Sequence, residues 1–234
     1  MAHTDWTNLQ PYILQFEQEG KVTRTFRRLE PERQMAVLNA ILAEAAEKGP
    51  ASLNIKEIAQ RAGVSVGSLY QYFPKREGLL DFAIELCTRF STGVFLEYRP
   101  LLAAMPLKEA LSAYLLGGLE WGETVMGLVR FFGRAAYQGD PYLAERVVRP
   151  IATVMRETVK EILTQAVARG EIRADVDLEA AARLVNSLTI VVGDSQLLPY
   201  LNTYFQVSDE QVSPERIMTA MVQFILRGIG VGTE

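Results

Sequence analysis

Histidine and cysteine are almost absent from this sequence. Its 234 residues contain one of each, His3 and Cys87. A single cysteine excludes a disulfide within the chain and a metal cluster built from cysteines, and it fits a reducing compartment. After His3 no imidazole is available for acid–base catalysis or for binding a metal. The sequence therefore predicts no metal site and no cofactor.

Long apolar stretches are missing as well. No uncharged apolar run approaches the roughly 20 residues that a membrane-spanning helix needs. The first ten residues also lack the basic flank and apolar stretch of a secretion signal. We therefore expect a cytoplasmic protein that has no membrane partner.

The charges are distributed unevenly along the chain. The whole sequence carries a formal net charge of −4, but residues 21–80 contain ten Lys and Arg against six Asp and Glu, a local balance of +4. A basic N-terminal quarter on an acidic body indicates that one end contacts a polyanion and the rest does not.

Helical periodicity runs through almost the whole sequence, and no strand–turn–strand alternation accompanies it. Apolar residues recur at spacings of three and four, which is typical of one helix face. Helices are predicted over 5–19, 33–48, 54–62, 65–73, 75–98, 106–119, 123–137 and 142–169, and two more begin after Asp177 and Ser213. Pro100 is expected to follow the end of its helix and Pro150 to kink the long one. The predicted fold class is all-α.

Residues 63–67 read GVSVG, a pattern that has two interpretations. As G-x-S-x-G it could be the nucleophile elbow of a serine hydrolase, which needs a strand before the serine and a histidine after it. Here a helical pattern precedes Ser65, and the only histidine is upstream of it. We therefore predict that Ser65 is not a nucleophile and that the protein is not an enzyme.

The same residues fit a corner between two short helices. Gly63 would end one helix in a left-handed conformation, and Ser65 would cap the next one, a contribution of about 1 kcal/mol. Two helices joined by so short a turn form a helix-turn-helix, whose second helix enters the major groove of DNA. A three-helix bundle that binds nothing would have the same local pattern.

A resemblance to the TetR family of transcriptional regulators is carried by residues 54–80, which read NIKEIAQRAGVSVGSLYQYFPKREGLL. Beyond residue 98 only the layout of long helices agrees. The resemblance implies a three-helix helix-turn-helix DNA-binding domain at 29–76 and a larger helical effector-binding and dimerisation domain at 77–234. Residues 1–28 form an N-terminal extension that is longer than the typical short arm of the family. Its basic arm at 21–28 would lie on the DNA backbone or in the minor groove, or would be a solvated run of charges.

The resemblance also implies roles for single residues. Phosphate contacts would fall on Asn54, Ser65, Tyr70, Tyr72 and Lys75. Base reading would fall on Val66, Ser68 and Gln71, with Lys56 reaching a base or the backbone. The small Gly67 would allow close approach to the DNA. Asn54 stands where threonine is usual, which still allows capping. Val66 stands where a polar residue is frequent, so readout there would rely on apolar contact with a thymine methyl.

In the body of the chain, the resemblance implies a homodimer and a pocket for a small hydrophobic effector. The apolar faces of the last two helices would form the dimer interface, or would instead face the core of the same subunit, through Leu184, Leu188, Val191, Val192, Met221, Val222, Ile225 and Ile229. Aromatic and methionine side chains of the middle helices would line the pocket: Phe90, Trp121, Met126, Phe131, Phe132, Tyr137 and Met155.

The predicted function is a ligand-responsive homodimeric repressor, which a small hydrophobic effector releases from a palindromic operator in double-stranded DNA. A serine hydrolase using Ser65 and a helical interaction protein that does not bind DNA are the alternatives. Neither alternative explains why basic residues and tyrosines gather around one short helix.

Overall fold

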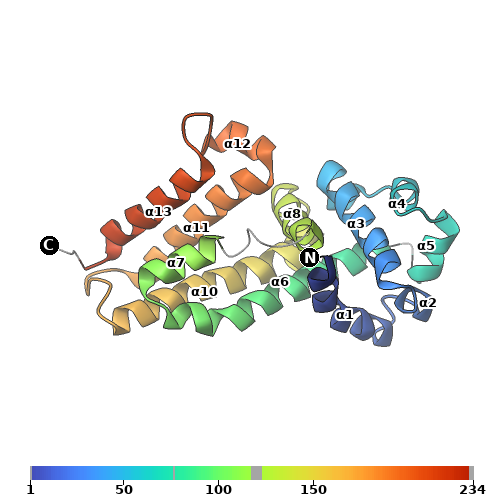
Figure 1. Ribbon diagram of the computed structural model, residues 1–234, viewed down its shortest axis with the longest axis horizontal. Coiled ribbons are helices and arrows are strands. Elements are labelled where there is room, and N and C mark those ends of the chain that lie inside the picture. The colour runs from blue at the N-terminus through green and yellow to red at the C-terminus, as the bar shows by residue number, and fades with distance from the viewer. Residues whose placement is uncertain (1, 76, 117–122, 232–234) are drawn as a thin grey trace. The chain divides into compact units, whose positions relative to one another are not determined.

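The computed structural model describes residues 2–75, 77–116 and 123–231 (Figure 1). Within these ranges the chain is helical and has no β-strand, which confirms the all-α prediction. The first elements are α1 (Ala2–Gln18), α2 (Arg24–Arg27), α3 (Pro31–Lys48), η1 (Pro50–Ser52), α4 (Ile55–Arg61), α5 (Val66–Tyr72) and α6 (Gly78–Ala104). They are followed by α7 (Leu107–Leu116), α8 (Glu123–Tyr137), α9 (Pro141–Leu143), η2 (Ala144–Val148), α10 (Arg149–Ala168), α11 (Leu178–Leu197), α12 (Pro199–Phe205) and α13 (Pro214–Ile229).

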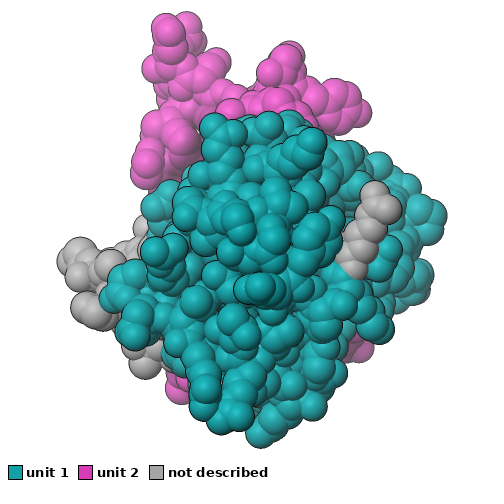
Figure 2. All heavy atoms as spheres, turned by 90° about the vertical axis from the view of Figure 1, so that its right-hand side faces the viewer, with its two compact units in different colours: residues 1–91, 121–150 teal, residues 92–120, 151–234 magenta. Residues whose placement is uncertain are grey.

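The chain divides into two compact units (Figure 2). Unit 1 comprises residues 1–91 and 121–150, and unit 2 comprises residues 92–120 and 151–234. Helix α6 therefore begins in unit 1 and ends in unit 2. The two units are defined by packing, and their division differs from the domain boundary expected after residue 76. The functional boundary at that residue stays a prediction.

Polar side chains cap several helices at the residues that the sequence predicts. The amide oxygen of Asn54 accepts a hydrogen bond from the first turn of α4 at 3.0 Å. The carboxylate of Asp177 does the same for α11 at 3.1 Å, and the hydroxyl of Ser213 for α13 at 3.3 Å. These caps could be predicted from sequence because a capping side chain bonds to N–H groups in the first turn of the helix that it starts.

Helix α6 does not end before Pro100, so that prediction was wrong. The helix continues to Ala104, and the side chains of Leu102 and Ala103 are buried. A proline inside a helix costs about 3 kcal/mol or more. Burial of the next turn offsets this cost, and Arg169 donates hydrogen bonds to the carbonyls of Ala103 (2.8 Å) and Met105 (2.7 Å).

The irregularity predicted at Pro150 takes the form of a π-helical turn, η2, directly before it. Proline has no N–H to donate to the carbonyl four residues earlier, which here belongs to Arg146. The hydroxyl of Thr88 on α6 donates to that carbonyl at 2.9 Å. The acceptor that the proline leaves free is thus satisfied by a neighbouring helix.

In unit 1, α8 packs closely against α3. Gly127 of α8 faces Leu42 of α3, and a Cβ atom at this glycine would lie 2.9 Å from a Leu42 methyl carbon. At the end of α8, the side-chain oxygen of Gln138 accepts a hydrogen bond from the N–H of Ala51 in η1 at 3.3 Å. Helix α8 therefore supports both α3 and the connection from α3 to α4.

Residues 21–28, the predicted basic arm, are folded against the rest of unit 1. Thr23 caps α2 by accepting a hydrogen bond from the N–H of Phe26, whose ring is fully buried. Lys21 and Arg27 form ion pairs with carboxylates of unit 1. The segment is thus attached to unit 1 through Phe26, Lys21 and Arg27, and its contact with DNA stays a prediction.

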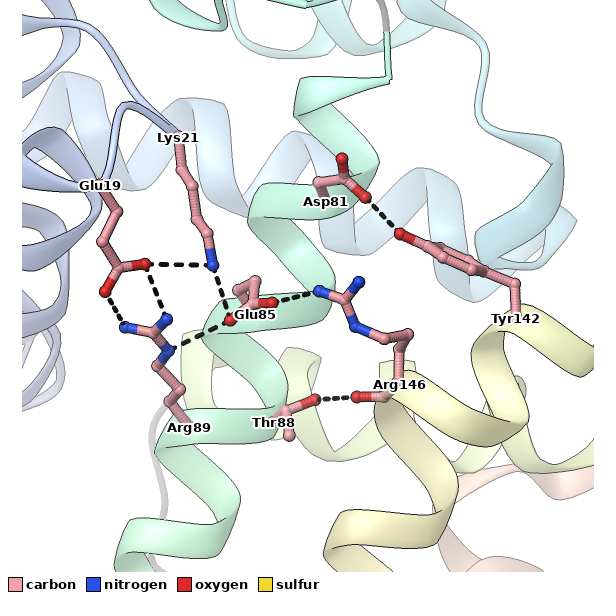
Figure 3. A network of polar contacts seen from close by, with 8 residues as sticks. All are labelled: Glu19, Lys21, Asp81, Glu85, Thr88, Arg89, Tyr142 and Arg146. Carbon is pink, nitrogen blue, oxygen red and sulfur yellow. Dashed lines mark hydrogen bonds and ion pairs between the residues drawn. The ribbon is translucent and has the colours of Figure 1, made fainter.

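A cluster of charges joins α1 and the segment after it to α6 (Figure 3). The guanidinium of Arg89 donates two hydrogen bonds to the carboxylate of Glu19, both at 2.7 Å. The ammonium of Lys21 lies 3.1 Å from Glu19 and 2.9 Å from Glu85. Glu85 also pairs with Arg146 of η2. We call these five residues the clamp.

The clamp predicts a loss of stability in acid. The hydrogen bond from Arg89, assisted by Lys21, lowers the pKa of Glu19 from 4.5 to about 2. A carboxylate with a lowered pKa stabilises the folded state above its unfolded pKa, and this contribution disappears as the pH falls through the folded pKa. Between about pH 5 and pH 2, we expect the melting temperature of Glu19→Gln to fall less steeply than that of the wild type.

Circular dichroism melts at a series of pH values measure this difference. Glu210→Gln, at an exposed position in the loop before α13, is the matched control and should keep the wild-type slope. Parallel slopes for Glu19→Gln and the wild type would show that the clamp does not stabilise unit 1.

Unit 2 is built around one hydrophobic core shared by α7, α10, α11 and α13. Helices α11 and α13 lie side by side (Figure 1). The buried side chains that form this core are Leu102, Leu107, Ala110, Leu111, Val159, Ile162, Leu163, Ala166, Ile172, Ala181, Ala182, Val185, Val192, Met218, Met221, Val222 and Ile225.

Candidate DNA-binding site

Helices α4 and α5 are joined by a tight turn centred on Gly63. Its φ angle is +64°, a left-handed conformation that a residue with a Cβ adopts at a cost. The N–H of Val64 closes α4 by donating to the carbonyl of Ala59 at 3.0 Å. The turn therefore follows from a glycine at the one position that requires positive φ.

Ser65 starts α5 and is occupied with capping. Its Oγ atom accepts a hydrogen bond from the N–H of Ser68 at 3.0 Å and lies 2.9 Å from the Ser68 hydroxyl. The element before it is helix α4, whereas a nucleophile elbow follows a strand. Ser65 thus has the geometry of a helix cap at the head of an exposed helix.

Helix α5 turns one face to the core and presents the other to solvent. Leu69 and Tyr72 are buried, while Gly67, Tyr70 and Gln71 are exposed. This separation follows the helical period in a segment of seven residues. The predicted base-reading positions Val66 and Ser68 are partly buried, at the edge of the exposed face.

The predicted phosphate contacts do not all lie at the surface. Asn54, Lys56, Tyr70 and Lys75 are exposed. Tyr72, in contrast, is 7% exposed, and its ring centroid lies 5.8 Å from that of Phe26.

Residues 21–28 supply two further cations that the structure leaves at the surface. Arg24 and Arg28 are exposed, and within the described ranges neither forms an ion pair. Lys56 and Lys75 are further exposed cations of unit 1. Exposed cations attract the phosphate backbone of DNA.

Thr23 and Phe26 were missed at the sequence level. The threonine was considered only as a member of a basic arm. A capping threonine three residues before a large apolar side chain was the available signal. It was weak, because α2 is only four residues long.

The residues predicted to line an effector pocket have mixed positions. Phe90 and Phe131 are buried, Met126, Phe132 and Met155 are partly buried, and Tyr137 is 41% exposed. Trp121 lies outside the described residues. Phe90, Met126, Phe131, Phe132 and Tyr137 belong to unit 1, and Met155 belongs to unit 2. Their role in a pocket stays a prediction.

The residues predicted for a dimer interface separate into two groups. Val192, Met221, Val222 and Ile225 are buried in the core of unit 2, so their side chains face this chain's own interior. Val191 and Ile229 are partly buried, whereas Leu184 is 66% and Leu188 36% exposed.

Phe224 was missed, although its ring is 70% exposed on α13. An apolar groove on the surface of unit 2 is lined by Ala180, Leu184, Leu188, Phe224 and Gly228, among others. These five residues define what we call the α11–α13 face. The sequence pattern favoured Met221 and Ile225 because they continue the main apolar stripe, and Phe224 lies beside that stripe.

Two general features of the described residues bear on function. No group of three or more His, Cys, Asp or Glu side chains there is arranged to hold a metal ion. In the same ranges, every helix is too short or too polar to cross a bilayer.

A short turn between α4 and a capped, exposed α5, in an all-helical chain, is the helix-turn-helix geometry typical of DNA-binding proteins. Residues 37–82 match the family profile of bacterial regulatory proteins, tetR family, and residues 128–191 match that of a tetracyclin repressor-like C-terminal domain. The chain belongs to the TetR family and is a DNA-binding transcriptional regulator.

Named relatives agree with this assignment. The chain is 27% identical over 146 residues to the HTH-type transcriptional repressor KstR2 of Rhodococcus jostii, covering 60% of this chain and 68% of that protein. It is 42% identical over 53 residues to the HTH-type transcriptional repressor KstR of Mycolicibacterium smegmatis, covering 23% of this chain and 26% of that one.

Solved structures share the fold. A TetR family regulator from Chloroflexus aurantiacus has a TM-score of 0.61 at 21% identity, covering 90% of this chain and 99% of that chain. The regulator FadR from Bacillus subtilis, in complex with stearoyl-CoA, has a TM-score of 0.59 at 19% identity, covering 84% and 99%.

Proposed function

We propose that the protein is a homodimeric repressor that reads a palindromic operator and leaves it when a small hydrophobic effector binds. The observation that carries the DNA-reading part is the α5 helix, which is capped by Ser65 and exposes Gly67, Tyr70 and Gln71. A helix of this kind enters the major groove with its early residues at the base edges. The lack of a side chain at Gly67 allows close approach.

Each exposed residue has a chemical role in this proposal. Gln71 pairs with adenine through its amide, which both donates and accepts a hydrogen bond. Lys56, Lys75, Arg24 and Arg28 attract phosphates and make binding weaken steeply with salt. Asn54 and Ser65 offer helix N-termini to the backbone.

Tyr72 has a different role from the one first expected. Because its ring is buried against Phe26, we propose that Tyr72 anchors the buried face of α5 to α2. Tyr70 remains the tyrosine whose hydroxyl is presented to a phosphate.

The α11–α13 face supports the proposal of a homodimer. Its exposed leucines and phenylalanine form an apolar surface on two neighbouring helices, and a second copy would bury it across a two-fold axis. Two recognition helices related by that axis match the two halves of a palindrome.

The effector part of the proposal draws on similarity of fold and of sequence. FadR carries stearoyl-CoA in a related fold. For this chain we propose a hydrophobic small molecule held in the helical body. Effector and operator would weaken each other's binding reciprocally, typically by about 1–3 kcal/mol.

Selection of DNA from a random pool tests the DNA-reading proposal. The wild type should enrich a palindromic sequence, and Gln71→Ala should lose about 1–3 kcal/mol of discrimination at one base pair in each half-site. Fluorescence anisotropy with every single-base variant of the selected site measures this loss. Gln165→Ala, on α10, is the matched control and should bind like the wild type.

If Gln71→Ala weakens all sequences equally, the glutamine does not read a base. A wild type that stays dimeric but enriches no sequence would favour a helical interaction protein instead.

A further inference from the structure

The segment between α1 and α3 is attached to the far end of the recognition helix. The hydroxyl of Thr23 donates to the carbonyl of Gln71 at 2.6 Å, and the N–H of Thr23 donates to the carbonyl of Tyr72 at 2.9 Å. Both acceptors belong to the last turn of α5. The last carbonyls of a helix have no partner within it, so a donor from another segment satisfies them.

A buried ring anchors this attachment. Phe26, three residues after Thr23, lies with its ring centroid 5.4 Å from that of Phe73 and 5.5 Å from that of Phe82. The side-chain amide of the buried Gln34 donates to the carbonyls of Phe26 (2.9 Å) and Arg27 (3.0 Å). Contacts of Phe26 and Arg27 with Gln34 of α3 and of Phe26 with Phe82 of α6 therefore hold the segment that carries Thr23 in place.

The clamp fixes the other end of the same segment. It connects Glu19 and Lys21 to Glu85 and Arg89 on α6 (Figure 3). The guanidinium carbon of Arg89 also lies 5.0 Å from the centre of the Phe16 ring, which packs α1 against α6. The segment between α1 and α3 is thus held by the clamp before Thr23 and by the buried ring of Phe26 after it.

The recognition helix depends on such supports. A helix of seven residues is too short to be stable alone, so its position is set by the packing of its buried face and by what contacts its two ends. Ser65 caps the start, and Thr23 bonds to the end. Hydrogen bonds to base edges require the side chains on this helix to be placed correctly.

We propose that Thr23 is a positioning residue for DNA reading and that residues 16–28 form a collar that holds α5 in its reading position. The proposal rests on the DNA-reading role of α5. The collar would act through the backbone of the helix, without contacting a base itself. It would therefore affect binding to the operator but not binding to DNA of unrelated sequence, which depends on phosphate contacts.

Thr23→Val tests the proposal, since it keeps the shape and removes the hydroxyl. We expect the affinity for the selected operator to fall by about three- to tenfold, because the variant loses the hydrogen bond to the Gln71 carbonyl and, with it, the cap that accepts from the N–H of Phe26. Affinity for a DNA of scrambled sequence should stay unchanged. Thr23→Ser restores the hydroxyl and should bind the operator within about twofold of the wild type.

Thr164→Val is the matched control, because the Thr164 hydroxyl also donates to a backbone carbonyl, that of Lys160 at 2.8 Å, on α10 in unit 2. It should leave both affinities unchanged. Circular dichroism establishes that each variant is folded before affinities are compared.

Three outcomes would overturn the positioning role: Thr23→Val binding like the wild type, Thr23→Val losing operator and scrambled DNA equally, or Thr23→Ser failing as Thr23→Val does. These outcomes all require a wild type that prefers its operator. A wild type without sequence preference would remove the DNA-reading role itself, which is a distinguishable result.

Discussion

Phe224→Glu is expected to convert the proposed dimer to a monomer and to reduce operator affinity by about 10²- to 10⁴-fold. The ring is 70% exposed on α13, beside Leu184 and Leu188 in the apolar groove of the α11–α13 face. A carboxylate there would have to be buried in the proposed interface without a partner. The loss is large because a monomer gives up the effective concentration that a dimer provides at the second half-site.

Analytical ultracentrifugation and fluorescence anisotropy measure the two effects. Leu14→Glu, at a leucine of α1 that is 49% exposed, is the control and should remain dimeric. A Phe224→Glu protein that sediments as a dimer would place the interface elsewhere on the molecule.

The free energy of unfolding should fall by about 3–5 kcal/mol in Phe26→Ala. Phe26 is fully buried, and its ring contacts those of Tyr72, Phe73 and Phe82. Its removal leaves a cavity between the collar and the recognition helix, which surrounding side chains fill only in part. Because the cavity lies behind α5, operator affinity should fall as well.

Urea denaturation followed by circular dichroism measures the loss. Tyr204→Ala removes a ring that is 81% exposed on α12 and should change stability by no more than about 0.5 kcal/mol. If Phe26→Ala lowers the free energy of unfolding by less than about 1 kcal/mol, the collar can separate from α5 without destabilising unit 1.

Much of the reading head could be predicted because its signals are local. Asn54, Gly63 and Ser65 act within one turn of their own position, and the structure gives each the predicted conformation or hydrogen bond. The exposure of Tyr70 and Gln71 follows from helical period once the buried position of Leu69 is recognised.

The faces of the last two helices could not be assigned in this way. Apolar residues on α11 and α13 cover more than one face, and period alone does not tell which face meets the chain's own core. Ile225 is 4% exposed and its neighbour Phe224 is 70% exposed. The difference depends on which helices pack against α13, which is set by residues far away in sequence.

The sequence by itself determined the helical class, the turn at Gly63, the caps and the family, because each depends on residues within a few positions of one another or on one dense motif. Only the tertiary structure decided that residues 21–28 fold onto α5, that α6 continues past Pro100, and that Phe224 is exposed. Thr23 reaches a carbonyl 48 residues away, and Arg89 reaches a carboxylate 70 residues away. Such contacts form because packing brings distant segments together, and no local pattern encodes that proximity.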